Sequence, residues 1–125
     1  MRKQLLLLGC GLFFLATFSS CRWGHNTSIS ISDSYDEYEM TVSYQKRKTN
    51  EVQRFLNECW EDNSNISFRR KRVDGMVILN DRTKFYLHSY PGELEIRIDK
   101  NENSPEACLK IKEVCEDIKE LLSGN

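Results

Sequence analysis

Two stretches of the chain repeat hydrophobic residues at the three- and four-residue spacing of an amphipathic helix. The first begins at Asn50, with Gln53 three residues later in the spacing of a helix-capping box. The second opens with Ser104-Pro105-Glu106, which supplies a cap, a proline at the first helical position and an acidic first turn. Each stretch therefore predicts a helix with one apolar face. These faces consist of Val52, Phe55, Leu56, Cys59 and Trp60 in the first helix, and of Cys108, Ile111, Val114, Cys115, Ile118, Leu121 and Leu122 in the second.

Other segments alternate apolar and polar residues or form short apolar runs bounded by turn signals, as strands do. The Asp74-Gly75 pair predicts a hairpin turn, and Pro91-Gly92 predicts another turn. The strand over residues 66–73 is the least regular of the set. The predicted strands are residues 38–44, 66–73, 76–79, 83–90 and 94–98.

These elements follow one another in the order β-α-β-β-β-β-α. A sheet with one apolar face and two helices with one apolar stripe each can bury all of that surface in two layers. We therefore predict an α+β fold, a two-layer sandwich in which both helices cover one face of an antiparallel-rich sheet of about five strands. The prediction places this single domain at residues 35–125 and leaves the opposite sheet face open to solvent or to a partner.

The N-terminus has the parts of an export signal. Two basic residues are followed by an apolar stretch over residues 5–18 and then by Ser19-Ser20-Cys21. A helix that spans a bilayer needs about 20 apolar residues, so a cleaved signal peptide fits this length better than a retained anchor.

The Ser19-Ser20-Cys21 sequence resembles the lipobox of bacterial lipoproteins, although Phe18 stands where leucine is commonest. The resemblance implies cleavage before Cys21, diacylglycerol on its sulfur and usually a third acyl chain on the new amino group. Two or three acyl chains hold a protein durably on a membrane. The expected location is therefore the cell envelope, on a membrane that faces the periplasm or the cell surface. An ordinary secreted protein cut near Ser20 and a second lipobox that ends at Cys10 are the alternatives.

On this interpretation residues 1–20 are the signal peptide, and residues 21–34 are the lipidated cysteine and a tether. The segment 22–33 is rich in Ser, Asn, Thr and Gly, which favours a tether. Residues 28–32 nevertheless alternate Ser and Ile, which is also the pattern of a short edge strand.

The charge balance excludes a dedicated nucleic-acid binder. Of the 18 basic and 19 acidic residues, only Arg2 and Lys3 fall in the signal, so the exported part has more acidic than basic side chains. Apolar and aromatic residues recur throughout that part, which also argues against a disordered chain.

Three cysteines follow the lipobox, all on predicted apolar helix faces. The predicted topology makes the helices antiparallel, which brings Cys59 near Cys108 and suggests a disulfide between them, since exported proteins favour such bonds. Three buried reduced thiols are the equal alternative. A zinc site of Cys59, Cys108, Cys115 and His88 lacks the paired spacing of structural zinc motifs, so no metal is expected.

Two features are candidates for partner binding. Arg69, Arg70, Lys71 and Arg72 form a basic run, which fits either a docking patch for an acidic partner or a charged edge strand that blocks aggregation. The rings of Tyr86, His88 and Tyr90 alternate away from the apolar side of their strand. They therefore belong on the open sheet face, where they fit either a binding surface or cross-strand packing.

Signatures of catalysis are missing from the sequence. It has no Cys-x-x-Cys redox motif and no glycine-rich phosphate loop, and its histidines have no nucleophile at a suggestive position. Glu93 and Glu95 share one strand face, as a glycosidase pair would, but a solvated strand face explains them better. We therefore expect a non-enzymatic binding or accessory protein without a cofactor, of the inhibitor, immunity or assembly type, whose partners are a membrane and another envelope or secreted protein. A glycan- or small-ligand-binding lipoprotein is the alternative, and an envelope enzyme is less favoured.

Overall fold

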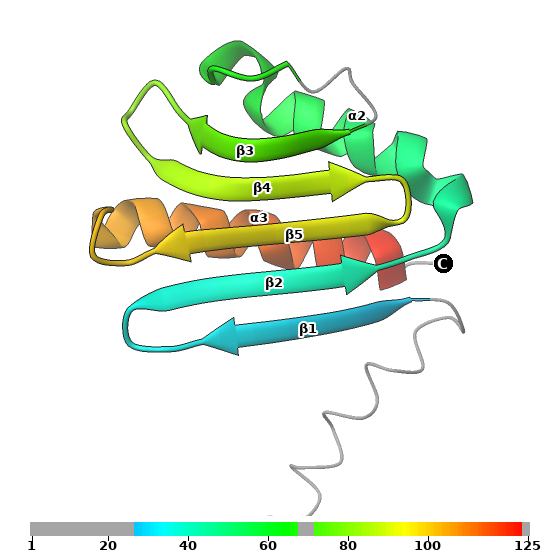
Figure 1. Cartoon of the computed structure of the whole chain (residues 1–125), viewed down its shortest axis with the longest axis horizontal. Coiled ribbons are helices and arrows are strands. Elements are labelled where there is room, and N and C mark those ends of the chain that lie inside the picture. Colours follow the sequence, from blue (N-terminus) through cyan, green and yellow to red (C-terminus); the bar gives the residue numbers. More distant parts are fainter. Residues whose placement is uncertain (1–26, 68–71, 124–125) are drawn as a thin grey trace, which may run out of the picture.

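The computed structural model describes residues 27–67 and 72–123, and this part of the chain forms one sheet with two helices (Figure 1). The strands pair in the order β1-β2-β5-β4-β3, and every neighbouring pair is antiparallel. The strands are β1 (Ser28–Asp33), β2 (Glu37–Ser43), β3 (Val73–Ile78), β4 (Lys84–Tyr90) and β5 (Glu93–Asp99). The helices are α2 (Thr49–Trp60) and α3 (Pro105–Ser123), with short 3-10 helices at η2 (Lys46–Lys48) and η3 (Glu61–Asn63).

Both helices lie on the same face of the sheet and run in opposite directions (Figure 1). The predicted α+β sandwich is therefore confirmed, with a five-stranded antiparallel sheet in one layer and two helices in the other. The core fills the space between the layers. Among its fully buried side chains are Phe85 and Ile96 from the sheet and Leu56 and Ile111 from the helices.

The first strand lies where we expected a tether. Residues Ser28–Asp33 form β1, which pairs with β2 over its whole length, so the edge-strand alternative is correct and the boundary at residue 34 is wrong. Alternating isoleucines explain this outcome, because Ile29 packs against the core while the serines face solvent.

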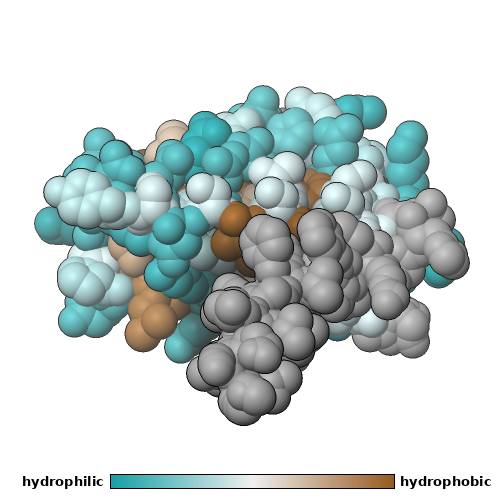
Figure 2. Space-filling view, turned by 90° about the horizontal axis from the view of Figure 1, so that it is seen from below, coloured by the Kyte–Doolittle hydropathy of each residue, from teal (hydrophilic) through white to brown (hydrophobic). Residues whose placement is uncertain are grey.

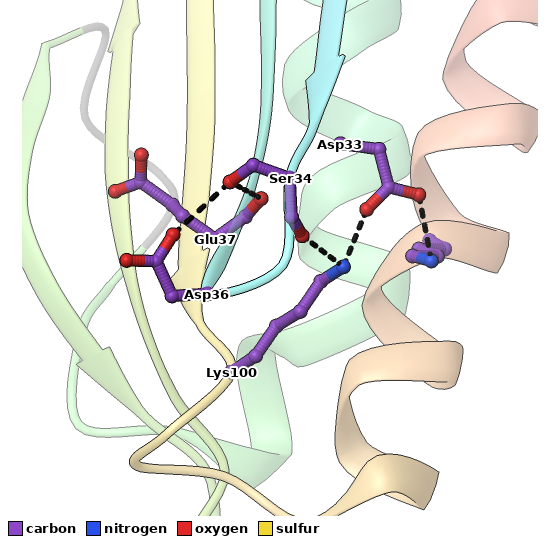
Figure 3. A network of polar contacts seen from close by, with 6 residues as sticks. Asp33, Ser34, Asp36, Glu37 and Lys100 are labelled. Carbon is purple, nitrogen blue, oxygen red and sulfur yellow. Dashed lines mark hydrogen bonds and ion pairs between the residues drawn. The ribbon is translucent and has the colours of Figure 1, made fainter.

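The turn after β1 is held by a polar network (Figure 3). Lys100 Nζ donates to Asp33 Oδ1 at 2.5 Å and to the Ser34 carbonyl oxygen at 2.6 Å, and Lys112 Nζ donates to Asp33 Oδ2 at 2.9 Å. These two ammonium groups hold the pKa of the Asp33 carboxyl below its usual value. The C-terminal end of β1 is thereby tied to residues that follow β5 and lie in α3.

The hairpin predicted at Asp74-Gly75 does not exist. Both residues lie inside the continuous strand β3, where Gly75 is opposite Leu87 of β4. Of the segment 66–73, the described residues Ile66, Ser67 and Arg72 are not in a strand and Val73 begins β3, while residues 68–71 lie outside the described residues. The hairpin prediction failed because a turn needs a second strand to pair with, and β3 pairs with β4 instead. The observed order of elements is therefore β-β-α-β-β-β-α.

The Pro91-Gly92 turn between β4 and β5 is confirmed. Gly92 has a positive φ of 80°, which glycine adopts without strain, and its N–H donates to Thr49 Oγ1 at 3.2 Å. A Cβ atom at this position would lie 3.1 Å from the Tyr44 carbonyl oxygen. The turn therefore joins the sheet closely to the start of α2.

Candidate functional site: the open sheet face

The sheet face opposite the helices is the candidate functional surface, and we call it the open sheet face. The strand register places its residues in rows across the sheet, in which carboxylates outnumber cationic side chains. The face consists of Ser28, Ser30 and Ser32 of β1, Glu37, Glu39, Thr41 and Ser43 of β2, Asp74, Met76 and Ile78 of β3, Lys84, Tyr86, His88 and Tyr90 of β4, and Glu93, Glu95, Arg97 and Asp99 of β5.

The three predicted rings of β4 do stand on this face. His88 stacks on Tyr90 with ring centroids 4.2 Å apart, and His88 Nε2 lies 3.1 Å from Glu93 Oε1. The other ring nitrogen of His88 is 4.0 Å from Asp74 Oδ1. The imidazole is thus placed between carboxylates of both neighbouring strands.

Tyr86 is held by side chains of both neighbouring strands. Its hydroxyl donates to Asp74 Oδ1 at 2.5 Å, and the Arg97 guanidinium lies over the ring at 4.5 Å from the centroid. The hydrogen bond to Asp74, with the help of burial, raises the pKa of Tyr86 to about 12. The cross-strand packing that we considered for these rings is therefore present, and it fixes the rings on the surface.

The predicted basic run is only partly described. Arg69, Arg70 and Lys71 lie outside the described residues. Arg72 is exposed, precedes β3, and places its guanidinium 4.8 Å from the centroid of the Tyr90 ring. Arg72 therefore lies at the border of the open sheet face and is not part of a separate edge strand.

Carboxyl groups crowd the middle of the face. Arg97 Nη1 donates to Glu95 Oε2 at 2.8 Å, and its Nε lies 3.6 Å from Glu37 Oε2. A hydrogen bond with Glu95 raises the pKa of Glu39, with smaller contributions from burial and repulsion, while Arg97 opposes the shift. Glu39 and Glu95 are therefore a like-charge pair that one guanidinium only partly neutralises.

Replacing Glu39 by glutamine is expected to stabilise the fold at neutral pH, by about 0.5 kcal/mol for a cross-strand pair screened by solvent. Because the pKa of Glu39 is raised, the folded state binds a proton at this carboxyl more tightly than the unfolded state does. The natural chain therefore gains stability as the pH falls through the pKa of Glu39. Urea unfolding at pH 7 and pH 3.5 measures the effect, and the difference between E39Q and the natural chain should disappear at the lower pH. An equal gain at both pH values would show that charge is not its cause.

Sequence reasoning missed the pairing of Arg97 with Tyr86. The alternation of residues 94–98 already placed Arg97 on the outer side of its strand, so a signal for its exposure existed. Its position beside Tyr86 depends on the register between β4 and β5, which the alternation does not contain.

The cysteines of the described part are free thiols, so the predicted disulfide between Cys59 and Cys108 is absent. The helices are antiparallel as expected, but Cys59 shares a hollow with Asp117 in the middle of α3. Asp117 lies on the opposite side of the α3 helix from Cys108, which shares a different hollow with Lys100. The prediction assumed that the end of α2 lies beside the start of α3, whereas the end of α2 lies beside the middle of α3.

The thiols are also unsuited to chemistry in this structure. Burial raises the pKa of Cys59 to about 11 and that of Cys115 to about 12, and it also raises the pKa of Cys108. Within residues 27–67 and 72–123 no three His, Cys, Asp or Glu side chains are grouped to hold a metal ion. The zinc hypothesis also fails on geometry, because His88 is on the open sheet face and the cysteines are on helices behind the sheet.

Comparisons with family models, with curated proteins and with solved structures found no match for this chain. Neither helix of the described ranges is both long and apolar enough to cross a bilayer.

Proposed function

We propose that this chain is a non-enzymatic binding protein of the bacterial cell envelope, anchored by lipid on Cys21, which holds another envelope or secreted protein on its open sheet face. The observation that carries the proposal is the one-sided arrangement of the fold. Both helices cover one face of the sheet, and the other face presents fixed aromatic rings among charged side chains. Rigid aromatic groups with polar borders are typical of protein-binding surfaces.

The short distance between the anchor and the sheet supports a role close to the membrane. Because β1 begins at Ser28, only residues 22–27 separate it from Cys21. Six extended residues span at most about 20 Å, roughly half the reach of the tether expected from the sequence. A partner of the open sheet face would therefore lie near the lipid head groups or in the same membrane.

A protein partner is favoured over a glycan. Sugars bind proteins by stacking on exposed aromatic rings, but guanidinium groups already lie over Tyr86 and Tyr90. A sugar would have to displace Arg97 or Arg72 before it could stack there. Charged and hydrogen-bonding groups of a protein partner can instead pair with the carboxylates around the rings.

The proposal is tested by photo-crosslinking in whole cells of the source organism. A photoreactive amino acid at Thr41, which is exposed on the open sheet face, should link to one partner in a saturable manner. The matched control carries the same photoreactive amino acid in place of Glu120, which is exposed on α3. Excess untagged protein should compete away the product from Thr41. Equal products from both positions, or none from Thr41, would count against the proposal.

Charge reversal distinguishes specific binding at the open sheet face from nonspecific electrostatic association. Glu93→Lys on the open sheet face should lower the yield of the Thr41 product about tenfold, because a desolvated like charge costs at least the ~1.4 kcal/mol that corresponds to that factor. Glu120→Lys makes the same change of net charge on the helix side and should alter the yield less than twofold. An equal loss in both variants would point to net charge instead of a binding face.

A further inference from the structure

The two edges of the sheet are treated differently by the described chain. At the β3 edge, Asn65 Oδ1 accepts the N–H of Ile78 at 2.8 Å, and Asn65 Nδ2 donates to the Met76 carbonyl oxygen at 3.4 Å. Ser64 adds a bridge to Leu79 just beyond the strand. These contacts occupy backbone groups of β3 that would otherwise be open to another strand.

At the other edge, three residues of β1 direct their backbone N–H and C=O groups away from the sheet. Ser34 N–H donates to the Glu37 carbonyl oxygen at 2.8 Å, and the antiparallel register continues from that pair along the whole of β1. In an antiparallel ladder, residues alternate between facing the partner strand and facing away. Counting back from Ser34, the serines of β1 bond to β2, while Ile29, Ile31 and Asp33 direct their N–H and C=O groups away from the sheet.

Over the described residues 28–32, this edge has none of the usual devices against pairing. Exposed edge strands are normally blocked by charges, prolines or bulges. Residues 28–32 contain no charge and no proline, and their register with β2 is unbroken. Figure 2, which views the molecule from the β1 side, shows hydrophobic side chains at the surface near the middle of this edge. Ile31 is 39% exposed there.

We infer that β1 pairs with β1 of a second copy of this chain, on a two-fold axis through Ser30, to give one continuous sheet. Opposite residues of an antiparallel pair have their side chains on the same sheet face. A residue whose backbone groups point away from β2 can therefore lie opposite only such a residue of the second copy. The axis through Ser30 places Ile29 opposite Ile31 of the second copy, and Asp33 opposite Thr27. This register forms about eight backbone hydrogen bonds, more than registers displaced by two residues.

The charges agree with a second copy as the occupant. Asp33 is the charged residue of β1, and Lys100 and Lys112 already neutralise its carboxylate. No two like charges face each other in the Ser30 register, although acidic residues are in excess over the domain. The alternating serines and isoleucines are also self-complementary, because each meets its own kind across the axis. The inference does not depend on the proposed function.

Cysteine cross-linking tests the register in membranes that contain the full chain. Ser30 meets Ser30 in a non-hydrogen-bonded pair, with Cα atoms about 4.5 Å apart, which a disulfide can bridge. Ser32→Cys is the matched control, because its two copies lie about 13 Å apart. After mild oxidation, Ser30→Cys should give at least tenfold more disulfide dimer than Ser32→Cys, above the background of the unmodified chain. Equal dimer from both variants, or a Ser30→Cys link to a different protein, would overturn the inference.

A second variant tests the backbone bonds themselves. The N–H of Ile31 faces away from β2, so Ile31→Pro removes a bond to the second copy and leaves the β1–β2 ladder intact. Combined with Ser30→Cys, it should lower the dimer yield at least tenfold, whereas Ile31→Val should keep it. Circular dichroism establishes that the proline variant is folded. A folded proline variant that cross-links as well as Ser30→Cys alone would contradict the pairing.

Discussion

Replacing Cys21 by alanine is expected to abolish fatty-acyl labelling of the chain. The sulfur of Cys21 is the attachment point that the lipobox resemblance implies, and a mature N-terminus at this residue would carry two or three acyl chains. Each buried methylene contributes about 0.8 kcal/mol to membrane binding, so this is the largest effect that any single substitution should have on location. Metabolic labelling with an alkyne fatty acid and the mass of the mature N-terminus measure it.

Cys10→Ala is the matched control, because Cys10 ends the competing lipobox and should leave labelling unchanged. A chain in which a cleavable secretory signal replaces residues 1–21 should be recovered as a soluble exported protein. Unchanged labelling of the Cys21 variant, or its loss in the Cys10 variant, would place the lipid elsewhere. A natural chain without acyl groups would remove the anchor from the proposed function.

Replacing Phe85 by alanine is expected to lower the free energy of unfolding by about 3–5 kcal/mol. Phe85 is fully buried in β4 and its ring lies 4.7 Å from that of Trp60 in α2, so the substitution opens a cavity between the two layers. A domain of this size has roughly 5–15 kcal/mol of stability in total, so the variant should be partly unfolded at physiological temperature. Urea unfolding followed by circular dichroism measures the loss.

Tyr35→Ala is the comparison for Phe85→Ala. Tyr35 lies in the turn between β1 and β2 and is 94% exposed, so its loss should change stability by at most about 0.5 kcal/mol. Similar losses in the two variants would mean that the interface between sheet and helices is not the main source of stability.

The candidate site was predictable as a face but not as a set of contacts. Alternation along one strand places Tyr86, His88 and Tyr90 on the same side, and two helices with one apolar stripe each must cover the other side. The partners of those rings come from neighbouring strands. Asp74 reaches Tyr86 and His88 only because β3 pairs with β4, and the sequence signal at Asp74-Gly75 favoured a turn instead.

The sequence by itself determined the two amphipathic helices, the strands β2, β4 and β5, and the turn at Pro91-Gly92, because periodicity and turn chemistry act between near neighbours. Only the tertiary structure decided that Ser28–Asp33 joins the sheet, that β3 runs through Gly75, and that Cys59 and Cys108 stay apart. Each of these depends on which distant segment supplies hydrogen bonds or a packing surface. Short segments with weak patterns take their conformation from such partners.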